Sequence, residues 1–173
     1  MRAVMFYHSL VSDWNHGNAH FLRGVRTELL RRGAEVEVWE PADGWSRNNL
    51  VAVHGEEPID EFLQGYPHLR SRLYQNPDEI NLRDVLSQAD LVLVHEWTEP
   101  SLVRRIGEHH RLHPSPKLFF HDTHHRAVSA PEEMRAYDLD AYDGILAFGE
   151  SLRRRYSKLI RIYRYSHGMR RRM

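Results

Sequence analysis

Histidine and acidic side chains follow two apolar runs of this chain, and these residue types are suited to acid–base chemistry. His95 and Glu96 end one run, and His121 and Asp122 end another. Imidazole titrates near neutral pH, and a carboxyl group beside it can accept or donate a proton. We therefore expect all four residues to be catalytic, either by hydrogen-bonding a substrate or by moving its proton. The alternative is that they bond nearby loop backbone or, for Glu96, cap the following helix in competition with Glu99.

A second group of residues has the properties of a substrate-binding surface. Gly17 and Asn18 stand at the expected start of a helix, where free backbone N–H groups and the helix dipole attract a phosphate or a sugar hydroxyl. The alternative for Gly17 is a tight turn of the chain. Trp97 offers a flat face to a sugar ring, although an isolated tryptophan can equally belong to the core. The substrate-binding residues that we predict are His16, Gly17, Asn18, His124, Gly149 and Glu150.

The segment from His121 to His125 also contains residue types that bind metal ions. Consecutive residues of an extended segment point in alternating directions, so few of them can converge on one ion. We expect no metal site. The chain has neither a G-x-G-x-x-G sequence nor a P-loop sequence, which leaves a standard dinucleotide site without support.

Five apolar runs must position these residues, and helix-length segments separate most of the runs. Nearly continuous apolar strands of this kind are typical of a parallel sheet with helices on both faces, as in Rossmann-like α/β folds. The carboxyl ends of such strands share one edge, where ligands bind. We expect His8, Gly17, His95, His121 and Gly149 along that edge. The predicted strands are Ala3–Tyr7, Glu35–Trp39, Leu91–His95, Lys117–His121 and Gly144–Phe148.

The helices are predicted from apolar residues that recur at spacings of three and four. A helix begins near Asn18, which can cap it, and Gly33 stands where a left-handed residue ends a helix. Prolines divide residues 41 to 88 into shorter pieces. The further helices that we predict are Ile59–Gln64, His68–Tyr74, Asn81–Gln88 and Glu99–His110.

Composition bounds the class of protein. A chain of 173 residues is long enough for one domain, and 41% hydrophobic with 28% charged residues is the usual globular mixture. The absence of cysteine excludes disulfides and thiol nucleophiles and fits a reducing compartment. We see no signal peptide and no apolar stretch of about 18 residues, so we expect a cytoplasmic protein without a membrane span.

The net charge of zero conceals an uneven distribution. Nine Lys or Arg residues and no acidic residue follow Glu150. A basic segment of this kind can contact nucleic acid, anionic lipid or an acidic partner. We favour the simpler interpretation, an unpacked chain end, and do not expect nucleic-acid binding.

Several segments resemble a known family. The segment HGNAHFLRGVRTELLRRGAEVEVWEP resembles the opening of GT-B glycosyltransferases of the family 4 type. The resemblance is closer to the CgeB-like proteins of that superfamily, and it covers about residues 1 to 156. The segments that carry it are HSLVSDWNHGNAHFLRG, EPADGWSRNNL, LVLVHEW, FFHDTHHRAV and YDGILAFGES.

The resemblance implies a division of labour between two domains. In such enzymes the N-terminal Rossmann-like domain faces the acceptor, and a second domain binds the nucleotide sugar. Residues 1–156 would be the acceptor-side domain, with Gly17 near the donor diphosphate and His121 near the transferred sugar. The resemblance implies no metal and no cofactor beyond the nucleotide sugar as co-substrate. Residues 157–173 depart from the family's linker, which suggests a truncated product or one half of a split enzyme.

Two functions remain open. The first is a glycosyltransferase domain that transfers sugar from a nucleotide-sugar donor to an acceptor only when a donor-binding domain is present. The second is a catalytically silent binding or scaffolding module. A donor-binding domain or a second copy of the chain are the partners that we expect. A third reading, a response-regulator-like domain, is disfavoured because no acidic cluster follows the first strand.

Overall fold

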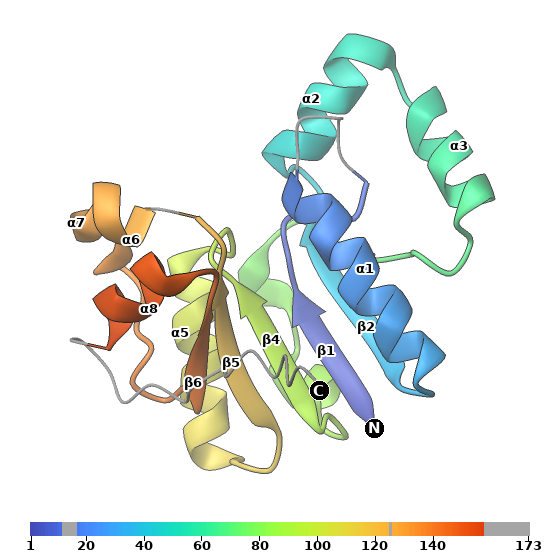
Figure 1. Cartoon of the computed structure of the whole chain (residues 1–173). Coiled ribbons are helices and arrows are strands. Elements are labelled where there is room, and N and C mark those ends of the chain that lie inside the picture. Colours follow the sequence, from blue (N-terminus) through green and yellow to red (C-terminus); the bar gives the residue numbers. More distant parts are fainter. Residues whose placement is uncertain (12–16, 125, 158–173) are drawn as a thin grey trace, which may run out of the picture.

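The structure is a six-stranded, all-parallel sheet with helices in its connections, a Rossmann-like α/β fold (Figure 1). The computed structural model describes residues 1–11, 17–124 and 126–157. The strand order is β3-β2-β1-β4-β5-β6. The strands are β1 (Arg2–Phe6), β2 (Glu35–Pro41), β3 (Arg72–Tyr74), β4 (Leu91–His95), β5 (Lys117–Asp122) and β6 (Gly144–Ala147).

The helices connect the strands and vary widely in length. The two longest, α1 and α5, follow β1 and β4. The helices are α1 (Gly17–Arg31), α2 (Trp45–His54), α3 (Glu57–Gly65), the 3₁₀ helix η1 (Pro77–Glu79), α4 (Leu82–Leu86), α5 (Pro100–Leu112), α6 (Arg126–Ser129), α7 (Pro131–Met134) and α8 (Glu150–Tyr156).

Two apolar clusters lie on the two faces of the sheet. On one face, Leu22 of α1 packs with Met5, Val38 and other residues of β1, β2 and β4. On the other face, side chains of α4, α5 and α8 pack with residues such as Val94 and Phe120. The central strands are therefore buried from both sides, which explains their continuous apolar runs.

The predicted α/β fold is confirmed, and its five predicted strands are all present within one or two residues. Gly33 has a φ of 78°, as expected for a left-handed residue after a helix. Asn18 was expected to cap α1 but lies inside its first turn, because the helix begins at Gly17.

The region between β2 and β4 differs most from the sequence prediction. The predicted helix His68–Tyr74 is wrong, because Arg72–Tyr74 forms the edge strand β3 beside β2. Helix α2 was not predicted. In that region the pairing with β2 decides the structure, and local apolar spacing does not show it. Within the described residues, no helix is long and apolar enough to cross a membrane.

Candidate functional site

The carboxyl ends of β1, β4 and β5 meet in the middle of the sheet. Strands β2 and β3 lie on one side of β1, and β5 and β6 lie on the other side of β4, so the order reverses between β1 and β4. Open parallel sheets bind ligands at such a switch point, outside the carboxyl ends of the strands. We call the residues gathered at this edge the rim. They are Tyr7, His8, His95, Glu96, His121 and Asp122.

The rings of the rim pack against one another. The ring centroid of His95 lies 4.8 Å from that of Tyr7, 5.1 Å from that of His8 and 5.4 Å from that of His121. On the far side of His121, the ring of Phe21 from α1 lies 5.2 Å away. Phe21 is 44% exposed and His121 only 6% exposed, so the phenyl ring reaches solvent whereas the imidazole next to it is almost completely covered.

His121 is a neutral imidazole in a defined orientation. Burial lowers its pKa to about 4, so it carries no charge near neutral pH. Its Nδ1 lies 2.7 Å from the hydroxyl of Tyr7. We infer that the Tyr7 hydroxyl donates to Nδ1, because it has no other partner within the described chain to which it could donate. The imidazole proton is then on Nε2, where His121 can donate a hydrogen bond.

Glu96 forms a second buried group directly beside the rings. Its Oε1 accepts hydrogen bonds from the backbone N–H of Thr123 at 2.8 Å and from the Thr123 hydroxyl at 2.9 Å. Its Oε2 lies 3.4 Å from the guanidinium of Arg126. The side chain is fully buried, so these contacts replace the water that the carboxylate would otherwise bind.

Asp122 lies beside Glu96 and is also fully buried. Burial, followed by the charge of Glu96, raises the pKa of Asp122 well above its usual range. The hydroxyl of Tyr156, which donates to Oδ2 at 2.6 Å, and the N–H of His124, which donates to Oδ1 at 3.0 Å, oppose this shift. Two negative charges close together and away from water cost free energy. The carboxyl pair therefore keeps one proton as the pH rises to near neutral.

Trp97, which directly follows Glu96 in the chain, is a partly exposed aromatic side chain, at 41%. The guanidinium of Arg126 lies 4.2 Å from its ring centroid, and the ring of His124 lies 5.8 Å away. An indole fixed in this way offers an apolar surface next to polar groups, which suits stacking against a sugar or another ring.

The helix-cap alternative for Glu96 is wrong. The residue before α5 is Glu99, and its side chain makes no capping hydrogen bond. The carboxylate of Glu99 instead accepts a hydrogen bond from the hydroxyl of Tyr74 at 2.9 Å. Glu96 bonds Thr123 and Arg126, as described above.

The predicted substrate-binding residues separate into three groups. His124 lies beside Trp97, next to the rim. Gly17 and Asn18 begin α1, and a side chain at Gly17 would meet nothing within 4 Å, so close packing does not require a glycine there. His16 lies outside the described residues.

Gly149 and Glu150 follow β6 and are exposed. Gly149 has a φ of 89°, a conformation that favours glycine. The carboxylate of Glu150 pairs with Arg153 at 2.6 Å and with Arg154 at 3.0 Å, and hydrogen bonds from these two residues lower its pKa to about 2. In the described part of the chain, no hydrogen bond or ion pair joins Gly149 or Glu150 to the rim side chains. One backbone bond, from Phe148 N–H to the Asp122 carbonyl, connects the two regions.

Several residues that hold the rim together were not predicted. Tyr7 is the last residue of the first apolar run, and its hydroxyl group at the end of that run was the one feature of the sequence that could have indicated a place in the rim. Arg126, Tyr137 and Tyr156 come from three later segments, and each bonds Glu96 or Asp122. Their spacing along the chain gives no indication of this convergence.

Within the described residues, no group of three or more His, Asp or Glu side chains could hold a metal ion. The arrangement instead offers a neutral hydrogen-bond donor, His121, and a buried carboxyl pair that carries a proton. Comparisons of the chain with protein-family models, with curated proteins and with solved structures found no match.

Proposed function

We propose that this chain is the acceptor-side domain of a GT-B-type glycosyltransferase and that its rim binds the substrate that accepts the sugar. One observation carries the proposal. A buried histidine, His121, which bonds the hydroxyl of Tyr7 and which burial keeps uncharged near neutral pH, ends β5 next to the switch point of a Rossmann-like sheet, and an exposed tryptophan, Trp97, follows β4 at the same edge. The segments that resemble GT-B enzymes include both of these residues, which supports the same class.

In this proposal His121 binds an oxygen atom of the reacting sugars. A neutral donor stabilises a developing negative charge without first requiring protonation of the imidazole. Sugar transfer breaks the bond between the anomeric carbon and the diphosphate oxygen, and the nucleoside diphosphate leaves with the bonding electron pair. A bond forms from the anomeric carbon to the acceptor oxygen, whose proton passes to the departing diphosphate. Trp97 would bind the apolar face of the acceptor if the acceptor is a sugar.

Glu96 and Asp122 have a different role in this proposal from the one their position first suggested. Neither carboxyl group reaches the surface. Each accepts a hydrogen bond from the backbone of the loop after β5, Glu96 from Thr123 and Asp122 from His124. The pair therefore acts as a positioning device that fixes this loop next to His121 and Trp97.

A catalytically silent binding module is the second candidate. The observation that favours it is the small exposure of His121, 6%, beneath Phe21. A histidine whose one hydrogen-bond partner among the described residues is Tyr7, and which packs among rings, can be part of the core. The two candidates differ in whether the rim contributes to turnover.

The test supplies the component that GT-B enzymes hold in a second domain. We would incubate the purified chain with radiolabelled nucleotide sugars and a panel of acceptors, alone and with a separately produced donor-binding domain. We expect transfer only in the mixture, because orientation of the two reactants is worth roughly 7–11 kcal/mol of the barrier. Transfer by the chain alone would contradict the two-domain proposal.

A variant pair then separates catalysis from folding. In the active mixture, His121→Ala should lower turnover by about 10²-fold. His54→Ala, at the exposed end of α2, is the matched control and should not change it. Equal turnover for His121→Ala and the unaltered chain, or no transfer with any donor domain, would favour the silent module.

A further inference from the structure

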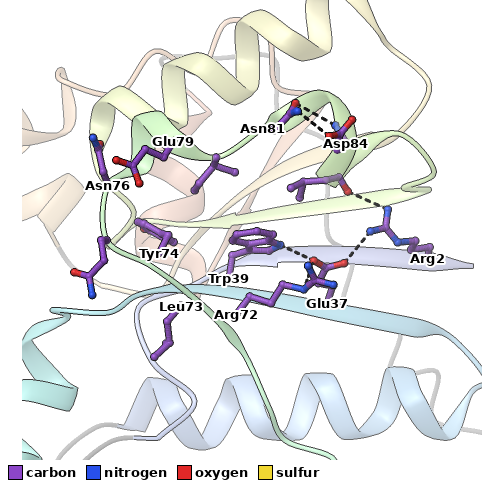
Figure 2. Close-up of a pocket in the computed structure, with 13 residues that line it drawn as sticks. Arg2, Glu37, Trp39, Arg72, Leu73, Tyr74, Asn76, Glu79, Asn81 and Asp84 are labelled. Atoms are coloured by element: carbon purple, nitrogen blue, oxygen red, sulfur yellow. Dashed lines mark hydrogen bonds and ion pairs between the residues drawn. The ribbon is translucent and has the colours of Figure 1, made fainter.

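A second concave region lies away from the rim, on the sheet face opposite α1. Among the described residues, a pocket of about 620 Å³ lies here between β2 and β3 on one side and η1 and the short helix α4 on the other (Figure 2). Pockets that bind small molecules in proteins have volumes of about 300–1,000 Å³. This pocket plays no part in the proposed glycosyltransferase function.

The floor of the pocket is an aromatic ring held in place by an ionic network. The indole N–H of Trp39 donates to Glu37 at 2.9 Å. Glu37 also binds the guanidinium of Arg2 at 2.8 Å and that of Arg72 at 2.9 Å. The guanidinium of Arg72 also lies over the Trp39 ring, 5.7 Å from its centroid. With its polar atom bonded, the half-buried Trp39 ring is held in a defined position at the base of the pocket.

Planar polar side chains surround this ring. Figure 2 shows Trp39 between Arg72 on one side and Asn81 and Asp84 on the other, with Glu79 and Asn76 farther along the pocket, beyond Tyr74. The amide of Asn81 donates to Asp84 at 2.7 Å. These bonds fix the wall of the pocket opposite Arg72.

Unused hydrogen-bonding atoms remain among the residues that line the pocket. The side-chain oxygen of Asn76 accepts the N–H of Asp78 at 2.9 Å, which leaves its amide NH₂ available as a donor. The carboxylate of Glu79 is exposed and has no hydrogen bond or ion pair within the described residues, so it is available as an acceptor. Arg72, 67% exposed, retains guanidinium N–H groups beyond the one that binds Glu37.

The mixture of donors and acceptors determines the ligand class. A phosphate accepts hydrogen bonds and would be repelled by Glu79 and Asp84, whereas an amine cation would face Arg2 and Arg72. A hydroxyl group both donates and accepts, so it can bond a carboxylate and an amide N–H at once. The C–H face of a pyranose ring in turn suits the apolar face of an indole.

We propose that this pocket binds a neutral saccharide, with one sugar ring packed on Trp39 and its hydroxyl groups bonded to Asn76, Glu79 and Arg72. The inference does not rest on the proposed function, because neither the rim nor transfer of a sugar is needed for binding here. It predicts a second saccharide site on the β2–β3 face.

The first experiment titrates the ¹⁵N-labelled chain with cellotriose, maltotriose and chitotriose and follows backbone amide shifts. We expect saturable shifts with at least one of these trisaccharides, centred on β2, β3 and η1. If no trisaccharide binds, or if the shifts are confined to the residues around Trp97 and His124, the inference is overturned. Tighter binding of inorganic phosphate or spermidine to the same residues would overturn the assignment of the ligand class.

The second experiment compares the affinity of matched variants for the trisaccharide that binds. Glu79→Ala and Trp39→Leu should each weaken binding by about tenfold. Glu61→Ala, an exposed glutamate on α3, and Trp45→Leu, an exposed tryptophan on α2, are the matched controls and should bind as the unaltered chain does. Because Trp39→Leu removes a half-buried ring, Glu79→Ala decides the outcome if that variant does not fold. Undiminished binding by Glu79→Ala would contradict the proposed site.

Discussion

Glu96 at the rim and Glu37 on the β2–β3 face each have three polar contacts, but their surroundings differ. Glu37 is 15% exposed and is shared by two guanidinium groups. Glu96 is fully buried, has one guanidinium contact and lies beside a second carboxyl group, Asp122. Glu37 thus has two guanidinium partners for one carboxylate, whereas at the rim two buried carboxyl groups have one guanidinium contact between them among the described residues.

The difference shows how residues of the same type acquire different properties. An ion pair near the surface exchanges water for partners at little net gain. A buried carboxylate cannot replace a lost partner with water, so removing a partner lowers the stability of the fold strongly. We therefore expect the rim to be the more sensitive of the two regions to mutation and to pH.

The largest expected effect is that of Glu96→Ala. It leaves two hydrogen-bond donors of Thr123 and the half-buried Arg126 without their carboxylate, and the loss should be about 3–5 kcal/mol of the free energy of unfolding. Urea denaturation followed by circular dichroism at pH 7 measures it. Glu37→Ala is the matched comparison and should cost less, because Arg72 returns to water. Equal losses would remove the distinction between the two regions.

A smaller effect is expected from Asp122, whose contribution to the free energy of unfolding depends on pH. Its raised pKa means that the folded chain binds a proton more tightly than the unfolded chain, so this contribution is lost as pH rises from about 4 towards 7. Asp122→Asn removes the titration and imitates the protonated form. The stability of the variant relative to the unaltered chain should therefore increase by about 2 kcal/mol between pH 5 and 7.

His121 acts in the opposite direction and makes this comparison necessary. Its pKa is lowered to about 4, so its contribution to stability is gained as pH rises from 4 to 6.5. In the unaltered chain the two slopes partly cancel. Glu40, with its pKa raised to about 7 by burial, adds to the slope of Asp122 and is present in both proteins. Denaturation at several pH values with Asp122→Asn gives the difference, and parallel curves would show that Asp122 does not titrate anomalously.

The smallest expected effect is that of Arg72→Ala. This residue is 67% exposed, and Glu37 keeps Arg2 and Trp39 as partners after its removal. The free energy of unfolding should change by less than about 0.5 kcal/mol. Thermal denaturation of Arg72→Ala and Glu96→Ala under the same conditions measures the smallest and the largest expected loss of stability together. A loss above 2 kcal/mol would show that the β2–β3 face depends on its ion pairs as strongly as the rim does.

The sequence predicted the parts of the molecule that depend on local apolar pattern. Leu91–His95 matches β4 residue for residue, because both faces of this strand are buried and its run is continuous. Since parallel strands share one edge, His95 and His121 could also be expected side by side, and they are paired in register. The functional roles assigned to these residues stay predictions.

The remainder depended on contacts between distant segments. Strand β3 has two exposed residues out of three, so no apolar run marks it, and only its pairing with β2 makes it a strand. The hydroxyls of Tyr137 and Tyr156 bond Glu96 and Asp122 across 41 and 34 residues. No local periodicity encodes such a bond, so the state of the carboxyl pair could not be predicted.

The strand order has a consequence for how the chain folds. Strand β1 pairs with β2, the next strand along the chain, but it pairs with β4 only after the chain has passed through β2 and β3. The bond from Arg2 to Asp90 spans 88 residues. Loop-closure entropy makes such long-range pairings slow to form. The bond between Tyr7 and His121 spans 114 residues. A folding intermediate that contains only β1, β2 and β3 therefore has a floor for the β2–β3 pocket but no rim, and amide exchange at His121 would report closure of the whole sheet.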